Sequence, residues 1–320
     1  MRATVGGSLL AVALLVGACS ANGSSGPGAD VIATTTTTTG PAVASATPPP
    51  PDTVAFSAAD DVTMRHLDLV DGSRPTITST GTYVAGTRAL PTTVWVPAGS
   101  GPFPTVVLAH GYRAGVGPYE RFAEVLAAHG YLVAAPSFPL TDEARAGANL
   151  DEADIDHEAA DMSFVLTELL ADPELGQVVD TDRIGAIGHS DGASVALQLG
   201  YGPTGRDTRL KAVVALTGGS PGAGLLHGPP TLLEQSDVDE YNDLSSATDL
   251  IDQITTSWWF LELHGATHAG PVEGDGTYTT LLDDTVLAFL DRKLAGTTDD
   301  DSAIARPADE EPALATLTRG

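Results

Sequence analysis

The stretch of sequence that decides the fold is residues 184–194, IGAIGHSDGAS. Its apolar beginning belongs to a strand-like segment, and its end opens a helix-like segment of small and apolar residues. Between them, Gly188, Ser190 and Gly192 form a small-x-Ser-x-small turn. Such a turn exposes the serine oxygen, and the two glycines let strand and helix approach closely. The stretch therefore predicts a strand–turn–helix unit in which Ser190 is a candidate nucleophile.

Strands and helices alternate on both sides of this unit. β-type segments near residues 76–78 and 92–96, separated by turn residues, indicate an antiparallel start. The short apolar runs that follow are typical of buried parallel strands. We expect strands at residues 105–109, 131–135, 183–187, 211–216, 231–234 and 258–263, and helices at residues 119–129, 155–170, 193–199 and 283–294. The sequence thus predicts an α/β fold with a mainly parallel central sheet and helices on both faces, in a single domain.

The histidines after Ser190 limit the choice of a catalytic base. A serine hydroxyl is a weak nucleophile, so it needs a base that is oriented by an acid. After an elbow of this kind the chain order is serine, acid, histidine, and His227 precedes the strand expected to carry the acid. The choice is then between His264 and His268. We favour His268, because it lies in the loop beyond the strand, whereas His264 ends the strand.

Two aspartates follow the strand expected at residues 231–234, and both are candidates for the acid. The acid of such a site lies in the loop after this strand, so Glu234, which is still inside the strand, is a poor candidate. Asp239 lies deeper in the loop than Asp237, and we favour Asp239. Asp237 stays the alternative, and its other interpretation is a residue that caps the turn or faces water.

The oxyanion that forms during acyl transfer needs two hydrogen-bond donors. The Asp191 amide directly follows the nucleophile, and the Tyr112 amide lies in the loop after the first expected parallel strand. Gly111 lets that loop turn tightly, and His110 is interpreted as a loop histidine that bonds neighbouring backbone. The carboxylate of Asp191 is unusual here, because its field opposes the developing negative charge unless it points away or is paired.

Composition excludes several classes of function. The 320 residues include 42 acidic and 15 basic side chains, a formal net charge of −27, so nucleic-acid binding is not expected. Cys19 is the only cysteine, which rules out an intrachain disulfide and a cysteine metal cluster. Serine chemistry needs no metal or organic cofactor, so we expect none.

The ends of the chain lack the signatures of a fold. Residues 1–19 resemble a bacterial lipoprotein signal peptide in which Cys19, at the end of LVGAC, is lipidated; a plain signal peptide is the alternative. Residues 20–52, rich in Thr, Pro and Ala, predict a disordered tether, and residues 297–320 predict a disordered acidic tail. The folded domain is expected at residues 53–296, exported and held at the extracytoplasmic face of the cell membrane only through the lipid.

Taken together, these features resemble the α/β-hydrolase superfamily. Within it, the chain is similar to the branch that holds dienelactone hydrolases, chlorophyllases, platelet-activating-factor acetylhydrolases and bacterial cutinase-like polyester hydrolases. The resemblance covers most of residues 90–292. It rests on the elbow and on PFP at 102–104, HGY at 110–112, LAAHGYLVAAP at 126–136, DMSFVL at 161–166 and DRIG at 182–185.

The resemblance implies a Ser–His–Asp triad. It assigns the acid to Asp239, because residues 232–239 align with the family's strand-Gly-Asp-x-Asp pattern, and the base to His268. It also makes Tyr112 the equivalent of an oxyanion-loop aromatic that, in the polyester hydrolases, contacts the acyl part of the substrate. The residue after the nucleophile is usually apolar or aromatic in these enzymes, so Asp191 departs from the family pattern.

These features favour hydrolysis of carboxylic esters, small or polymeric, through an acyl-enzyme on the cell envelope. Residues 137–160 are too short for a large lid, so an open cleft is expected. The alternatives are a peptidase or amidase of the same fold, and a non-catalytic binding protein of the envelope. Asp191 beside the nucleophile is the feature that favours the binding protein.

Overall fold

The computed structural model describes residues 62–203, 205–219 and 226–320. The predicted signal peptide with its lipidated cysteine, residues 1–19, and the predicted tether, residues 20–52, lie outside the described residues and stay predictions. Within the described part of the chain, no helix is long and apolar enough to cross a membrane.

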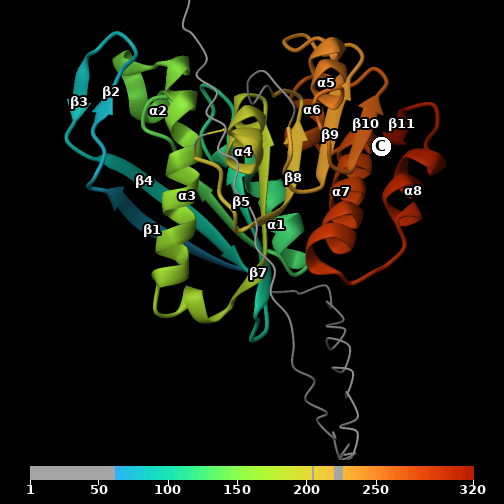
Figure 1. The fold of residues 1–320 in the computed structure, drawn as a ribbon, viewed down its shortest axis with the longest axis horizontal. Coiled ribbons are helices and arrows are strands. Elements are labelled where there is room, and N and C mark those ends of the chain that lie inside the picture. Colours follow the sequence, from blue (N-terminus) through green and yellow to red (C-terminus); the bar gives the residue numbers. More distant parts are fainter. Residues whose placement is uncertain (1–61, 204, 220–225) are drawn as a thin grey trace, which may run out of the picture. The chain divides into compact units, whose positions relative to one another are not determined.

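A mainly parallel sheet forms the centre of the described fold (Figure 1). Its strands lie in the order β1-β4-β6-β5-β7-β8-β9-β10-β11, and β2 and β3 form a small sheet of their own. Neighbouring strands from β6 to β10 are parallel, whereas β1 and β4 at one edge and β11 at the other are antiparallel to their neighbours. The strands are β1 (Thr63–Asp71), β2 (Thr76–Ile77), β3 (Tyr83–Ala85), β4 (Arg88–Val96), β5 (Phe103–Ala109), β6 (Leu132–Pro136), β7 (Val179–His189), β8 (Leu210–Leu216), β9 (Thr231–Ser236), β10 (Trp258–Leu263) and β11 (Ala315–Arg319).

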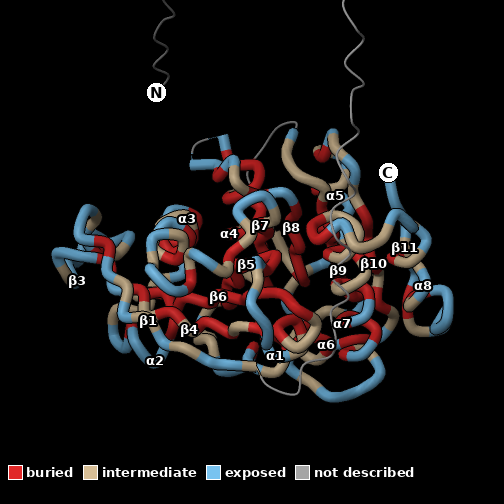
Figure 2. Tube along the Cα trace, turned by 90° about the horizontal axis from the view of Figure 1, so that it is seen from below, coloured by how far each residue is buried: buried red, intermediate tan, exposed pale blue. Residues whose placement is uncertain are grey.

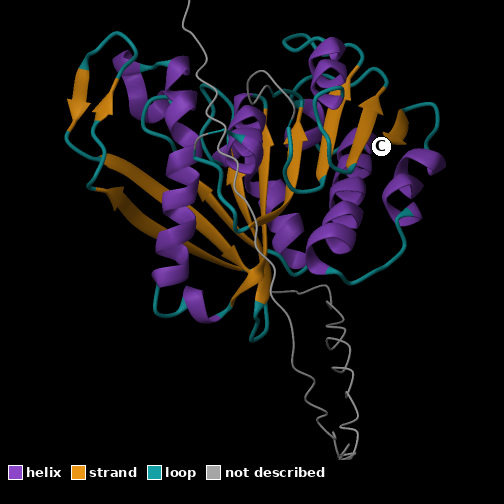
Figure 3. Ribbon diagram, in the orientation of Figure 1, coloured by secondary structure: helices purple, strands orange, loops and turns teal. Residues whose placement is uncertain are grey.

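Helices cover both faces of this sheet (Figure 3). Buried residues of α3, α4 and α5 belong to one apolar cluster, and those of α1, α6, α7 and α8 belong to the other. The mainly parallel sheet therefore has the covered faces that the apolar strand runs predicted. The helices are α1 (Glu120–Ala128), α2 (Glu143–Ala146), α3 (Ile155–Ala171), α4 (Asp191–Tyr201), α5 (Leu244–Ile251), α6 (Gly270–Glu273), α7 (Thr277–Leu290) and α8 (Ser302–Glu310).

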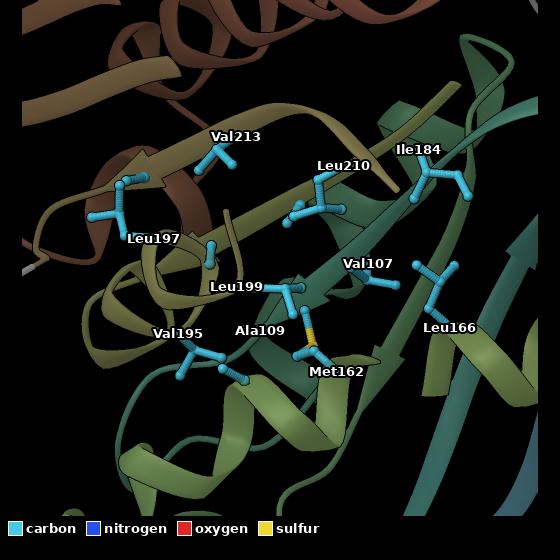
Figure 4. Packing of buried hydrophobic residues seen from close by; sticks show 14 of the residues in the cluster. Val107, Ala109, Met162, Leu166, Ile184, Val195, Leu197, Leu199, Leu210 and Val213 are labelled. Carbon is cyan, nitrogen blue, oxygen red and sulfur yellow. The ribbon is translucent and has the colours of Figure 1, made fainter. Parts of the chain in front are cut away.

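Strand β5 illustrates how the sequence divides between the two clusters. Every residue of β5 is buried, and the central strands are the most buried part of the trace in Figure 2. Side chains alternate across a strand, so Val106 and Leu108 join the cluster under α1 and α7, while Val107 and Ala109 join the other. Figure 4 shows Met162 of α3 beside Ala109, within the cluster that also holds buried residues of α4 and α5. Strand β5 thereby delivers its following loop, residues 110–112, to the carboxyl edge of the sheet.

The C-terminal segment corrects the predicted domain boundary at residue 296. Residues 297–320, predicted to be a disordered acidic tail, contain α8 and β11, and β11 pairs with β10. The prediction was wrong because it weighed the acidic runs alone; α8 is amphipathic, and it buries Ile304 and Ala308 while its charged residues stay exposed. Strand β11 therefore covers the edge of β10, the strand that leads toward His268.

Candidate active site

The turn at Ser190 has the geometry of a nucleophile elbow. Ser190 joins β7 to α4 with φ 58° and ψ −124°, a backbone conformation that residues other than glycine rarely adopt. A Cβ on Gly188 would lie 1.8 Å from the Gly192 carbonyl oxygen, and one on Gly192 would lie 2.3 Å from the Ala109 carbonyl oxygen. Both positions therefore need glycine, as the motif predicted, and the tight turn presents the serine at the edge of the sheet.

Three side chains form one line of hydrogen bonds at this edge. Ser190 Oγ lies 2.9 Å from His268 Nε2, and His268 Nδ1 lies 2.8 Å from Asp239 Oδ2. A carboxylate can only accept, so His268 carries its proton on Nδ1 and leaves the Nε2 lone pair free for the serine hydroxyl. The structure thus brings together the three residues that the sequence favoured, in an arrangement that can transfer a proton from the serine.

Asp239 is held as a charged group by its hydrogen bonds. Its side chain has no exposed surface, and burial by itself favours the neutral form. The amides of Asn242 and Tyr241 donate to Oδ1 at 2.9 and 2.8 Å, while His268 bonds Oδ2. These bonds outweigh the burial and hold the pKa of Asp239 below its usual value. The Gln235 amide also donates to Oδ2 at 2.9 Å, which fixes the carboxylate toward the imidazole.

The alternative acid and base lie together, away from Ser190. Asp237 Oδ1 accepts from the Gly265 amide at 2.8 Å, and its Oδ2 lies 3.4 Å from His264 Nδ1. The other ring nitrogen of His264 bonds the Thr316 hydroxyl at 3.0 Å. These two residues and Glu262 have side-chain N or O atoms within 4.8 Å of one another, and none of the three lines the cleft around the serine.

The loop after β5 is fixed by a buried histidine. His110 Nε2 accepts from the Phe138 amide at 3.1 Å, so its proton lies on Nδ1 and is donated to the Gly111 carbonyl at 2.9 Å. Burial lowers the pKa of His110 to about 4, against the effect of the Gly111 bond, so the ring is neutral near pH 7. That carbonyl and the Tyr112 N–H belong to one planar trans peptide and point in opposite directions. The histidine therefore sets the direction of the Tyr112 amide.

The two expected oxyanion donors have no competing partner. Among the described residues, neither the Tyr112 amide nor the Asp191 amide makes a hydrogen bond. Gly111 lies against the elbow, because a Cβ placed on it would approach Ser190 Cβ to 3.1 Å. The loop and the elbow are therefore adjacent, and both amides are available to a developing oxyanion.

A cleft of about 440 Å³ surrounds the serine and carries three carboxyl groups. Burial and the charge of Glu152 raise the pKa of Asp191, while His268 opposes this rise. Burial also raises the pKa of Glu273, again opposed by His268. Asp191 Oδ2 is buried without a hydrogen-bond partner in the described part of the chain. The carboxyl that departs from the family pattern is thus unpaired, and it loses its charge at higher pH than an exposed aspartate does.

Two buried side chains of the cleft were not found from the sequence. Tyr119 and His189 line it, and both are buried, with 1% and 3% of their surface exposed. His189 lies inside the elbow motif, but the variable position of a small-x-Ser-x-small pattern carries no prediction of its own. Tyr119 lies at the start of α1, and its contacts in the site are with residues distant in the sequence. A local sequence pattern does not indicate such contacts.

Comparisons with known proteins agree with this fold. A family model described as chlorophyllase matches residues 69–235. Among solved structures, a ferulic acid esterase from Streptomyces cinnamoneus is similar, with a TM-score of 0.63 at 22% identity over 82% of this chain and 98% of that chain. No match is found among curated proteins. The shared architecture confirms the predicted α/β-hydrolase fold, a mainly parallel sheet with helices in a single domain.

Proposed function

The chain belongs to the chlorophyllase family of the α/β-hydrolase superfamily, and from this premise we propose that it is a serine esterase that cleaves carboxylic esters. The observation that carries the proposal is the line of hydrogen bonds from Ser190 through His268 to Asp239. The family match and the likeness to a ferulic acid esterase support the same class of reaction.

The first half of the reaction acylates the serine. As Ser190 Oγ bonds to the ester carbonyl carbon, its proton passes to His268 Nε2, and Asp239 stabilises the imidazolium that forms. The carbonyl oxygen becomes an oxyanion that accepts from the amides of Tyr112 and Asp191. When the carbon–oxygen bond to the alcohol breaks, His268 gives its proton to the departing alkoxide, which leaves as the alcohol.

The second half regenerates the enzyme with water. His268 Nε2 takes a proton from water as the water oxygen bonds to the acyl carbon, and the same two amides hold the second oxyanion. The bond from the acyl carbon to Ser190 Oγ then breaks, and His268 returns the proton to the serine. The products are a carboxylic acid and the free enzyme, so the chain's own residues supply every proton transfer.

A panel of p-nitrophenyl esters of increasing acyl length, with the corresponding anilides, tests this function. We expect ester turnover by the wild type and a loss of about 10³-fold or more in Ser190→Ala, because the nucleophile is removed. Ester turnover that does not exceed that of Ser190→Ala would contradict the esterase proposal. Turnover of anilides in preference to esters would assign the site to an amidase instead.

We also propose that the enzyme acts at the extracytoplasmic face of the membrane, anchored by a lipid on Cys19. The support is the lipobox-like stretch LVGAC at residues 15–19, which contains the only cysteine of the chain. Membrane fractionation of cells expressing the full chain tests this, with Cys19→Ala as the comparison. The wild type should sediment with membranes and the variant should not; equal sedimentation of both would contradict the anchor.

A further inference from the structure

A second chain of hydrogen bonds runs beneath the cleft, through two buried side chains. The Gly111 amide lies 2.9 Å from Tyr119 Oη, and Tyr119 Oη lies 2.9 Å from His189 Nδ1. The other ring nitrogen, His189 Nε2, lies 3.1 Å from the backbone carbonyl oxygen of His268. This Tyr119–His189 bridge therefore connects the loop that carries one oxyanion donor to the backbone of the proposed base.

The partners at the two ends fix the direction of every hydrogen bond in the bridge. A carbonyl only accepts, so His189 carries its proton on Nε2 and offers a lone pair at Nδ1. Tyr119 must then donate its hydroxyl proton to Nδ1, and its oxygen accepts the Gly111 N–H. Each group has a partner, and one arrangement of protons satisfies the whole bridge.

Burial keeps this arrangement in place. Tyr119 and His189 have 1% and 3% of their surface exposed, so water does not compete for their hydrogen bonds. Burial lowers the pKa of His189 to about 4, although the bond to the His268 carbonyl opposes this. The ring is therefore neutral over the range in which an esterase works, and Nδ1 stays an acceptor for Tyr119.

The bridge holds two parts of the site that must be aligned with each other in the transition state: the loop that carries the Tyr112 amide and the backbone of His268. Gly111 precedes Tyr112, whose amide is a proposed oxyanion donor. The Gly111 amide itself donates a hydrogen bond to the Tyr119 hydroxyl, which holds the loop in place. At the other end, the backbone of His268 is held by His189, and its amide is held at 3.0 Å by Glu240. The ring that receives the serine proton therefore extends from a backbone fixed on both sides.

We propose that Tyr119 and His189 are positioning residues, which align the oxyanion loop with the base His268 without touching the substrate's reacting atoms. This inference rests on the proposed esterase function. The bridge contributes to the transition state, because it sets the direction of a donor and the position of a base, and it contributes little to binding of the ground state. Loss of the bridge should lower kcat and leave KM nearly unchanged.

The test compares two buried tyrosines, each losing only its hydroxyl. Tyr119→Phe breaks the bridge, whereas Tyr201→Phe removes a hydroxyl that bonds the Pro229 carbonyl at 2.6 Å and Thr231 Oγ1 at 2.6 Å, away from the cleft. Thermal unfolding and p-nitrophenyl ester kinetics are measured for both. We expect similar losses of stability, and a fall in kcat of about 10- to 100-fold for Tyr119→Phe alone, the range that follows misplacement of reacting groups.

A double-mutant cycle separates the bridge from a general loss of packing. His189→Leu keeps a side chain of similar size but removes both ring nitrogens, and with them the acceptor for Tyr119. Because that link is then already broken, adding Tyr119→Phe to His189→Leu should change kcat much less than it does in the wild type. Equal effects in both backgrounds would overturn the bridge.

The outcomes distinguish this inference from the function on which it rests. In one outcome, the wild type hydrolyses esters while Tyr119→Phe lowers kcat no more than Tyr201→Phe does, or raises KM rather than lowering kcat. Either result would show that the positioning role is wrong and would leave the esterase function in place. If the wild type hydrolyses no more ester than Ser190→Ala, the proposed function fails and the inference fails with it.

Discussion

Glu234 inside β9 and Asp239 in the loop that follows both have side chains shielded from water, yet their pKa values move in opposite directions. Glu234 has 1% of its surface exposed, and the Asp239 side chain has none. Burial and the charge of Asp239 raise the pKa of Glu234 to about 8. The pKa of Asp239 is instead lowered.

The difference lies in the hydrogen-bond partners of the two carboxyls. Asp239 receives hydrogen bonds from two backbone amides, from Gln235 and from His268. Neither carboxyl oxygen of Glu234 has a partner among the described residues. Burial makes a bare charge costly but strengthens the hydrogen bonds of a paired one. One carboxyl is therefore suited to stabilise an imidazolium, and the other is held as a neutral acid.

Replacing Asp239, the carboxyl held by four hydrogen bonds, should have the largest effect on activity. Asp239→Asn should lower kcat by about 10³- to 10⁴-fold, because an amide does not hold the imidazole in the tautomer that accepts the serine proton. Ester kinetics with Glu234→Gln and Asp237→Asn as controls should show changes of only a few-fold. An equal loss in Asp237→Asn, or a small loss in Asp239→Asn, would assign the acid differently.

Replacing Glu234, the buried carboxyl without hydrogen-bond partners in the described part of the chain, should change stability rather than activity. Burial raises the pKa of Glu234 in the folded chain to about 8, above its ordinary value of 4.5. Between these values the folded state keeps a proton that the unfolded chain has released, so this group makes the free energy of unfolding fall as pH rises. Glu234→Leu should remove that fall and raise the free energy of unfolding at pH near 8 by about 1–3 kcal/mol, the cost of an unsatisfied buried polar group.

Urea unfolding at pH near 5 and near 8 measures this effect. The exposed Glu124 of α1 supplies the matched control, Glu124→Leu, which should change stability alike at both pH values. A gain for Glu234→Leu that is no larger at the higher pH would contradict a neutral buried acid in the folded state.

The smallest effect is expected at Asp191, which is only partly buried. The charge of His268 lowers the pKa of Asp191, so the two groups interact electrostatically in the cleft. Asp191→Asn should therefore move the acid limb of the kcat/KM profile to lower pH, by about 0.3–0.5 unit for one partly screened charge. Asp182→Asn, at the opposite end of β7 from Ser190, is the control and should leave the limb in place. A shift of the acid limb to higher pH in Asp191→Asn would contradict this prediction.

Much of the fold could be predicted because buried parallel strands leave a plain pattern. The segment predicted at 258–263 is β10 with the same bounds, and the one at 231–234 is β9, which continues to Ser236. The strands at the edges were harder to find. No residue of β1 before Asp71 is buried, and β11 buries only Ala315, so neither leaves an apolar run.

The candidate site divides in the same way. Ser190 could be placed because its turn demands glycine on either side, and His268 and Asp239 followed from the order of elements along the chain. The Tyr119–His189 bridge could not, because it joins residues 70 positions apart and depends on where the folded sheet brings them. Local patterns predict the groups that react, whereas the groups that hold them emerge only from the tertiary structure.

The central claim is that Ser190 is the nucleophile of a hydrolase, and covalent labelling tests it most directly. The folded protein is treated with a fluorophosphonate, digested, and the modified peptide is identified by mass spectrometry. We predict one phosphonyl adduct, on Ser190 of the wild type, and none on Ser190→Ala. A folded wild type that takes no label, or a label that persists in Ser190→Ala, would contradict the account.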